Sequence, residues 1–127
     1  MPIRKIMVVD DSPTERAYMD GLLKKKGYEV VLVDSGEVAI ERAKSDLPDL
    51  ILMDVVMPGL NGFQATRAIT RDEKTKHIPV IMLSSKDSLF DRARGRMVGS
   101  DEYLTKPFTK ESLLRAVESH LVQRSPA

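Results

Sequence analysis

The chain has 127 residues, a formal net charge of +1, 42% hydrophobic and 31% charged residues, and no cysteine. These values fit one soluble domain with its own core, and they argue against wholesale nucleic-acid binding, disulfides, thiolate metal sites and a cysteine nucleophile. Apolar stretches stay well short of the roughly 20 residues that span a membrane, and residues 1–5 lead straight into a predicted strand, which leaves no room for a signal peptide. We therefore expect a cytoplasmic protein without membrane insertion, formed by one domain over residues 1–127 with a core from about 4 to 122.

Five short apolar runs, which alternate with segments of helical period, predict the strands. They lie at residues 6–9, 30–33, 50–53, 80–83 and 103–105. Unbroken runs rich in valine and isoleucine are typical of strands buried on both faces of a parallel sheet. The sequence thus predicts an α/β protein of (βα)₅ order with right-handed crossover connections.

A start signal after the first strand predicts the first helix. Ser12 as N-cap, Pro13 at the first helical position and Glu15 two residues later form a capping box, in which the serine and glutamate side chains bond backbone N–H groups reciprocally. The helix is expected to end at Lys26-Gly27. Its apolar residues, expected on one face, are Tyr18, Met19, Leu22 and Leu23.

The second and third helices follow the next two strands. The second runs from about Gly36 to Ser45 and is ended by Pro48. Its apolar side is expected to consist of Ala39, Ile40, Ala43 and Leu47. The third helix begins with Asn61 as its cap, after a loop rich in proline and glycine.

The fourth and fifth helices complete the pattern. The fourth begins at Asp87 or Ser88, and Gly95 inside it costs about 1 kcal/mol relative to alanine, so we expect this helix to be pliable. The fifth begins at Thr109, and residues 123–127 are expected to form a frayed tail. The seven methionines are expected to fill the core.

Polar side chains follow four of the predicted strands at the point where each strand ends. They are Asp10, Asp11, Asp54, Ser84 and Lys106. In open α/β sheets ligands bind outside the carboxyl ends of the strands, so we expect these side chains to meet. Three neighbouring carboxylates repel one another unless a hard cation lies between them, and Mg²⁺ prefers such oxygen ligands together with substrate phosphate. Calcium is disfavoured because the chain has no ligand-rich loop of Asp, Asn and Gly.

The same set of residues predicts phosphoryl chemistry at Asp54. Aspartyl phosphates are known covalent intermediates, and phosphoryl transfer needs mainly positioning and neutralisation of charge. Mg²⁺ and Lys106 would supply the positive charge, and the Ser84 hydroxyl would donate a hydrogen bond to a phosphoryl oxygen. Any one of these residues alone would be read as a helix cap or a surface ion pair. Their occurrence at four strand ends in order makes that explanation a poor one.

Four motifs together resemble a bacterial response-regulator receiver domain of the CheY-like, single-domain type. They are VVDDS at 8–12, LILMDVVMPGLNGF at 50–63, VIMLSS at 80–85 and DEYLTKPF at 101–108. The resemblance extends from Ile6 to about Leu121 and implies a flavodoxin-like, doubly wound parallel sheet with strand order 2-1-3-4-5. The DDSPTE and MPGLNGFQATR segments are similar to regulators of chemosensory systems that drive type IV pilus twitching.

The resemblance also implies roles for individual residues of the site. Asp54 matches the phosphorylated aspartate, and Lys106 matches the lysine that contacts the phosphate. Asp10 and Asp11 match the acidic pair that binds Mg²⁺. Val56 matches the position that offers a backbone carbonyl to the metal.

The resemblance further implies a switch and its partners. Ser84 matches the switch hydroxyl and Tyr103 the switch aromatic, and the family usually has a cis peptide before the proline that is Pro107 here. The implied partners are a histidine kinase or phosphotransfer domain and an unidentified output protein, with the chain itself a monomer. The fourth and last helices would form the partner surface, unless they present only a solvated face. Its charge would come from Arg92, Arg94 and Arg96.

Three positions near the expected phosphoryl group depart from the family pattern. Val56, Ser85 and Lys86 flank the expected phosphoryl group with unusual residue types, which leaves the lifetime of the phosphate open.

A phosphatase of the haloacid dehalogenase type is the alternative, but it needs two aspartates separated by one residue, and usually a cap domain. A nucleotide-binding domain is excluded because no glycine-rich loop follows the first strand. We expect a signalling protein that catalyses only its own phosphorylation and dephosphorylation, and acts by switched binding or as a phosphate sink.

Overall fold

The computed structural model describes residues 4–124, in which five strands alternate with five helices. In chain order these are β1 (Lys5–Val9), α1 (Pro13–Lys25), β2 (Glu29–Val33), α2 (Gly36–Asp46), β3 (Leu50–Asp54), α3 (Gly62–Arg71), β4 (Val80–Ser84), α4 (Leu89–Met97), β5 (Glu102–Thr105) and α5 (Lys110–Arg124). The strands form one parallel sheet of order β2-β1-β3-β4-β5. The predicted (βα)₅ fold and its strand order are confirmed.

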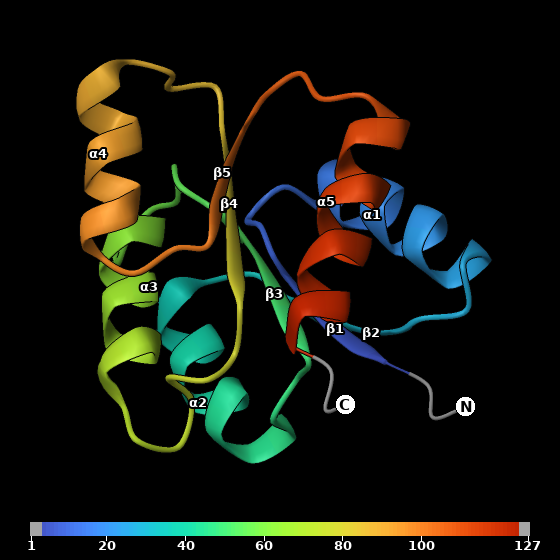
Figure 1. Ribbon diagram of the computed structural model, residues 1–127, viewed down its shortest axis with the longest axis horizontal. Helices are drawn as coiled ribbons and strands as arrows, with labels where there is room; N and C mark the ends of the chain where they lie inside the picture. The colour runs from blue at the N-terminus through green and yellow to red at the C-terminus, as the bar shows by residue number, and fades with distance from the viewer. Residues whose placement is uncertain (1–3, 125–127) are drawn as a thin grey trace.

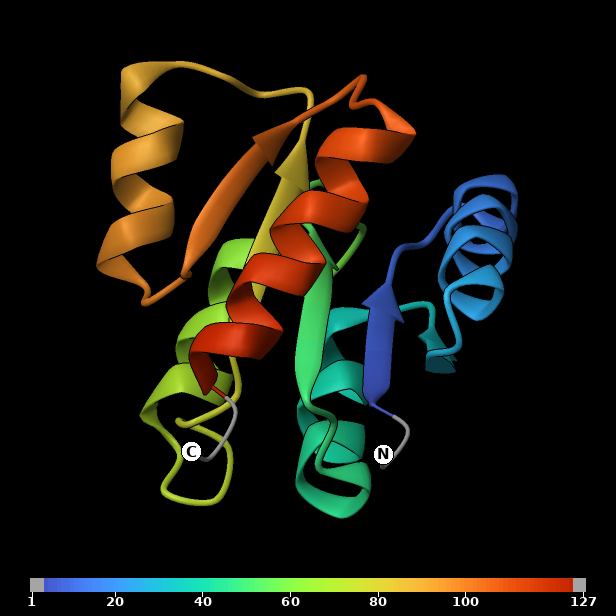
Figure 2. The same cartoon turned by 45° about the vertical axis from the view of Figure 1, so that its right-hand side comes forward.

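Helices cover both faces of the sheet. α1 and α5 lie on one face, and α2, α3 and α4 lie on the other (Figure 1 and Figure 2). Along β1, Ile6 and Val8 belong to the core beneath α1 and α5, whereas Met7 and Val9 belong to the core beneath α2 and α3. Successive side chains of a strand point to opposite faces, so a strand covered on both sides must be apolar throughout. Burial of each such side chain contributes ~1.5–3 kcal/mol relative to exposure.

Two apolar side chains expected on buried helix faces are exposed instead. Tyr18 of α1 is 52% exposed and Leu47 is 53% exposed. The buried residues of α1 are Met19 and Leu23, a pair four residues apart, and Tyr18 lies beside that stripe rather than in it. α2 has already ended at Asp46, and Leu47 caps it in the left-handed conformation with φ of 46°. The chain leaves the helical path there, so Leu47 does not continue the buried side.

The prediction that the methionines fill the core is correct for most of those described. Five are buried: Met7, Met19, Met53, Met57 and Met82. Met97, at the end of α4, is 83% exposed, and Leu89 and Phe90 at the start of the same helix are 86% and 89% exposed. Gly95 is the buried residue of α4, so the large apolar side chains of this helix face solvent. Met1 lies outside the described residues.

The last helix is longer than the sequence predicts. α5 continues to Arg124, so the frayed tail expected from Gln123 does not begin there, and its remainder at 125–127 lies outside the described residues. Within residues 4–124, no helix combines the length and apolar character that crossing a membrane requires.

Candidate functional site

The carboxyl ends of the central strands bring the predicted site residues to one edge of the sheet. Asp10 and Asp11 directly follow β1, and its backbone register pairs Val9 with Met53 of β3. Asp54 is the next and last residue of β3, and it pairs with Leu83 of β4. The strands therefore deliver three carboxylates side by side.

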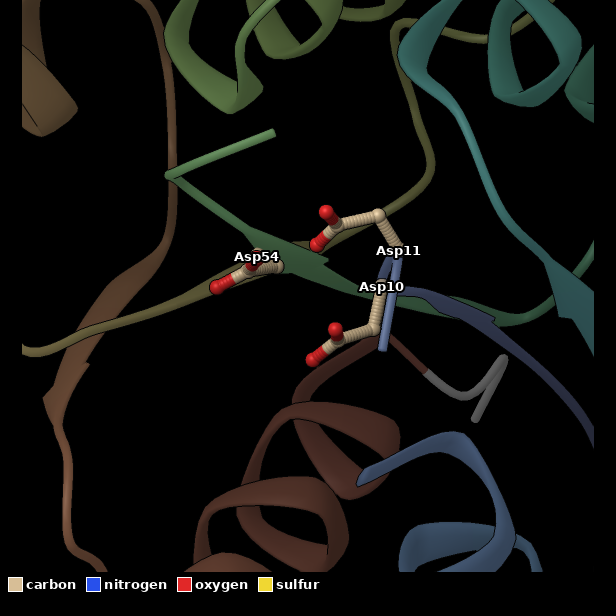
Figure 3. A group of neighbouring side chains, drawn as sticks. All are labelled: Asp10, Asp11 and Asp54. Carbon is tan, nitrogen blue, oxygen red and sulfur yellow. The ribbon is translucent and has the colours of Figure 1, made fainter. Parts of the chain in front are cut away.

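Oxygens of three aspartates form a compact acidic cluster. Asp10, Asp11 and Asp54 each place one carboxylate oxygen within 4.8 Å of the others. Figure 3 shows that the side chains of Asp10 and Asp11 point towards the side on which Asp54 lies. Asp10 and Asp54 are buried, whereas Asp11 is exposed. An all-oxygen set with one solvent-facing member fits Mg²⁺, which takes one or two carboxylates and keeps several waters.

The ammonium group of Lys106 is the positive centre of the site. Lys106 follows β5, and its backbone N–H donates to the carbonyl of Ser84 at 2.8 Å. Its Nζ lies 3.0 Å from Asp54 Oδ1, 3.4 Å from Asp10 Oδ2 and 2.9 Å from Glu15 Oε2. The peptide bond from Lys106 to Pro107 is cis, as the resemblance implied.

Burial and charge act on these groups in opposite directions. Burial raises the pKa of Asp10 to about 6, although the Ser12 backbone N–H opposes the rise. Burial also raises the pKa of Asp54, against the hydrogen bond from Lys106. For Lys106, burial lowers the pKa, but the hydrogen bonds to Glu15 and Asp54 outweigh it and hold the pKa above the ordinary value. The lysine thus stays charged beside carboxylates that burial pushes towards protonation.

Glu15 is a member of the site that sequence reasoning did not find. The pattern from Ser12 to Glu15 was explained as a capping box, and Ser12 Oγ does accept a hydrogen bond from the Glu15 N–H at 3.3 Å. The reciprocal half is absent, because the Ser12 N–H donates to Asp10 Oδ1 at 2.8 Å. The Glu15 carboxylate reaches Lys106 instead. Its place in the first turn of α1, four residues beyond Asp11, is the one local signal that it faces the strand ends.

Ser84 and Tyr103 meet on the backbone of Lys86. The Lys86 N–H donates to Ser84 Oγ at 2.9 Å, and the Tyr103 hydroxyl donates to the Lys86 carbonyl at 2.6 Å. Ser84 is buried at the end of β4, while Tyr103 is half-buried on β5. The loop between β4 and α4 is therefore held by one side chain from each of two neighbouring strands.

An open pocket lies over the acidic cluster. Asp11, Glu15, Asp54, Val56 and Lys106 line it, among others. Val56 lies two residues past the end of the buried strand β3, and its side chain is 53% exposed in this pocket. The pocket gives a ligand access to Asp54.

The three arginines proposed for the partner surface differ in their surroundings. Arg92 bonds Asp87 Oδ1 at 2.6 Å and Thr105 Oγ1 at 2.7 Å, and its guanidinium lies 5.5 Å from the ring centre of Tyr103. Arg94 lies 4.4 Å above the ring centre of Phe63. Arg92 is half-buried, whereas Arg94 and Arg96 are both exposed.

Comparisons with known proteins agree with this geometry. The model of the response regulator receiver domain matches residues 6–118. Protein PilG of Pseudomonas aeruginosa is 48% identical over 96% of this chain and 90% of PilG, and protein PilH of the same organism is 44% identical over 92% of this chain and 97% of PilH. These matches decide against the alternative of a haloacid dehalogenase-type phosphatase.

Solved structures of two relatives share the fold. The chemotaxis protein CheY4 of Vibrio cholerae is 32% identical, with a TM-score of 0.88 over 93% of this chain and 98% of that one. The receiver domain of the sensor histidine kinase PA1611 from Pseudomonas aeruginosa is also 32% identical, with a TM-score of 0.88 over 95% of this chain and 99% of that one, and it has a magnesium ion coordinated in its active-site cleft. From its sequence, its sheet and its acidic cluster, this chain belongs to the family of response regulator receiver domains.

Proposed function

We propose that this receiver accepts a phosphoryl group on Asp54 from a histidine kinase or phosphotransfer domain and changes its protein contacts in response. The observation that carries the proposal is the position of Asp54 Oδ1, 3.0 Å from the Lys106 ammonium and within the cluster formed with Asp10 and Asp11. A buried carboxylate beside a cation and at the base of an open pocket is placed to attack a phosphorus atom.

The transfer uses the residues of the site in separate roles. An Asp54 oxygen attacks the phosphorus of a phosphohistidine as the bond from phosphorus to the histidine nitrogen breaks, and that nitrogen keeps the bonding electron pair. Lys106 donates to the oxygens on which charge develops. Asp10, Asp11 and Asp54, with the Val56 carbonyl, would hold Mg²⁺. When bound, Mg²⁺ would add positive charge opposite the phosphoryl oxygens.

The signal leaves the site through Ser84 and Tyr103. Phosphorylation adds roughly −1.5 to −2 charge at Asp54. If the Ser84 side chain rotates so that its Oγ moves to a phosphoryl oxygen, Ser84 gives up its hydrogen bond with the Lys86 N–H, and the loop before α4 loses one of the contacts that hold it. Tyr103 contacts the same residue of the loop through the Lys86 carbonyl, so a change at Asp54 shifts the population of Tyr103 and of the loop together.

The proposed output face consists of α4, β5 and α5. Three large apolar side chains of α4, those of Leu89, Phe90 and Met97, are more than four-fifths exposed there, and Arg96 adds a positive charge beside them. The similarity to PilG and PilH favours a chemosensory pathway for pilus motility. We propose that the receiver acts there as a monomer in the cytoplasm.

Labelling with a small phosphodonor tests the function. With Mg²⁺ and acetyl phosphate, the parent protein should gain the mass of one phosphoryl group, removable by hydroxylamine. Asp54→Asn should gain none. Asp34→Asn is the matched control, since Asp34 is exposed and follows β2 at the same edge of the sheet, and it should label as the parent does. Undiminished label in Asp54→Asn would contradict the proposal.

A further inference from the structure

Glu15 holds the cation that the phosphoryl group would need. Its Oε2 lies 2.9 Å from Lys106 Nζ, compared with 3.0 Å for Asp54 and 3.4 Å for Asp10. An ammonium group has three N–H donors, so these three carboxylates engage all of them. A phosphoryl oxygen that takes a hydrogen bond from Lys106 must therefore share the ammonium with one of these carboxylates or displace it. Glu15 is the exposed one, with 45% of its side chain accessible against 0% for Asp10 and 8% for Asp54, so it is the carboxylate that can most readily give way.

The charge of Glu15 also faces the space that a phosphoryl group would fill. Glu15, Asp54 and Lys106 line the same open pocket, and the Glu15 side chain is 45% exposed. Burial is the main cause of the raised pKa of Asp54, and the charge of Glu15 adds to it. The carboxylate of Glu15 thus already opposes negative charge at Asp54, and it would oppose the larger charge of an acyl phosphate more strongly.

Helix capping does not account for this side chain. In a capping box the Glu15 carboxylate would bond the Ser12 N–H, but that group donates to Asp10. The helix is capped by Ser12 Oγ without any help from the Glu15 carboxylate. A negative charge in the first turn favours a helix in a general way, yet this effect requires no contact with Lys106.

We propose that Glu15 is a regulatory counter-ion: it occupies Lys106 while Asp54 is unmodified, and its charge lowers the affinity of the site for a phosphoryl group. This inference rests on the proposed phosphorylation of Asp54 and adds a residue that sets how readily the phosphorylated state forms. The family motifs quoted above assign no role to Glu15. Its competition with the phosphoryl group is electrostatic, and it transfers no proton and forms no bond.

Beryllofluoride binding in saturating Mg²⁺ tests the inference without covalent chemistry. The chain lacks tryptophan, so binding is followed by the ¹⁹F NMR signal of the bound ion. Glu15→Gln keeps the length of the side chain and an oxygen that accepts from Lys106, but removes the charge. The repulsion between two unit charges about 4 Å apart in a water-like medium corresponds to about a fivefold change in affinity, so we expect Glu15→Gln to bind beryllofluoride about fivefold more tightly or better. The gain should shrink as salt rises from about 0.05 to about 0.5 M, because Glu15 is half-exposed and screened.

Controls separate this effect from a change of net charge or of folding. Glu73→Gln removes the same charge from a side chain that is 84% exposed and paired with Lys76, in the connection that enters the amino end of β4, and it should bind as the parent does. Glu15→Ala removes the charge without introducing an amide group, so its beryllofluoride affinity provides a second measurement if the glutamine variant perturbs α1.

The outcomes distinguish this inference from the proposed function. Tighter binding in both Glu15 variants, with parental binding in Glu73→Gln, supports the counter-ion role. Parental or weaker binding in the Glu15 variants, in a parent protein that binds beryllofluoride and labels on Asp54, overturns the inference alone. A parent protein that neither binds beryllofluoride nor labels overturns the proposed function, and the inference with it.

Discussion

At the scale of single residues, one ammonium group is shared by three carboxylates, two from the β1–α1 segment and one from the end of β3. Lys106 contacts Glu15, Asp10 and Asp54, which lie 91, 96 and 52 residues away from it in sequence. The aspartates and the lysine could be predicted because each follows an apolar run, and the ends of parallel strands meet. Glu15 could not be assigned in this way. A local capping pattern explains it equally well, and its true partner is fixed only when α1 packs beside the strand ends.

Metal binding at the acidic cluster depends on single carboxylates. Removing the charge of Asp11 with Asp11→Asn should weaken Mg²⁺ binding about tenfold or more, because the remaining aspartates carry less attraction for a divalent cation. Asp34→Asn should leave the affinity unchanged, since that residue follows β2, beyond β1 from the cluster. Calorimetric titration with Mg²⁺ measures both. Equal affinities in parent and Asp11→Asn would contradict the assignment of the acidic pair.

The pH dependence of Mg²⁺ binding should report the burial of Asp10. Burial raises the pKa of this carboxyl to about 6, so the folded, metal-free protein holds this proton at pH values where an unfolded chain, near 3.9, has lost it. This group therefore makes the metal-free protein less stable as pH rises between those two values. A proton on Asp10 competes with the cation, so Mg²⁺ affinity should fall below pH 6 by up to about tenfold per unit. Affinity that stays constant from pH 7 to pH 5 would show that Asp10 does not compete.

At the scale of elements, α4 is where sequence and structure differ most. The central strands were predictable because burial on both faces demands apolar residues, as at every position but the last of β3 and β4. α4 lies at the edge of the sheet beside β5. Its large apolar side chains face solvent, while the guanidinium groups of Arg92 and Arg94 lie over the rings of Tyr103 and Phe63. The hydrophobic pattern of a nine-residue helix does not show whether its apolar side chains are buried in the core or exposed at a binding surface, because both kinds of helix carry apolar residues.

Side-chain packing explains why glycine occupies position 95 of α4, which helix propensity alone does not. A Cβ at this position would lie 3.0 Å from Tyr103 Cδ2 and 3.2 Å from Ser100 Oγ. The glycine lets the Tyr103 ring approach the helix, where the ring also stacks on Phe63 at 6.4 Å between centres. The predicted pliability of this helix is thus not needed to explain the residue.

Alanine substitutions at two helical glycines should separate packing from propensity. Gly21 in α1 has open space around its Cβ position, so Gly21→Ala should raise the free energy of unfolding by about 0.4–1 kcal/mol. Gly95→Ala gains the same propensity but pushes on Tyr103, so it should gain clearly less or lose stability. Urea unfolding of the two variants gives the comparison. Equal stabilisation by both would mean that the Tyr103 ring moves away without cost.

At the scale of the whole molecule, the fold connects the charged site at the strand ends with the exposed apolar side chains of α4. The acidic cluster lies at the carboxyl ends of β1 and β3. The helix α4 lies on the far side of β4 and β5 from these two strands (Figure 2). The Lys86 backbone, held by Ser84 and Tyr103, is the structural connection between them. A switch needs this connection, whereas a phosphate sink needs only the site.

Partner binding distinguishes a switch from a phosphate sink. Proteins retained from a lysate should differ between the parent with and without Mg²⁺ and beryllofluoride, and the difference should shrink in Tyr103→Ala, which removes both the hydroxyl contact to Lys86 and the ring against Gly95. Identical retention in all four combinations would leave a receiver that only drains phosphate from its kinase.

The path from Asp54 to α4 is tested by following backbone amides with ¹H–¹⁵N NMR as beryllofluoride is added with Mg²⁺ to the parent and to Ser84→Ala. In the parent we predict changes at two sets of amides: those around Asp54 and Lys106, and those of Lys86, α4 and β5. In Ser84→Ala the first set should persist and the second should shrink, because the hydroxyl that couples the site to the Lys86 backbone is gone. A parent in which amides near Asp54 change while those of Lys86 and α4 do not would contradict the proposed path of the signal, and a parent without changes near Asp54 would contradict the proposed function itself.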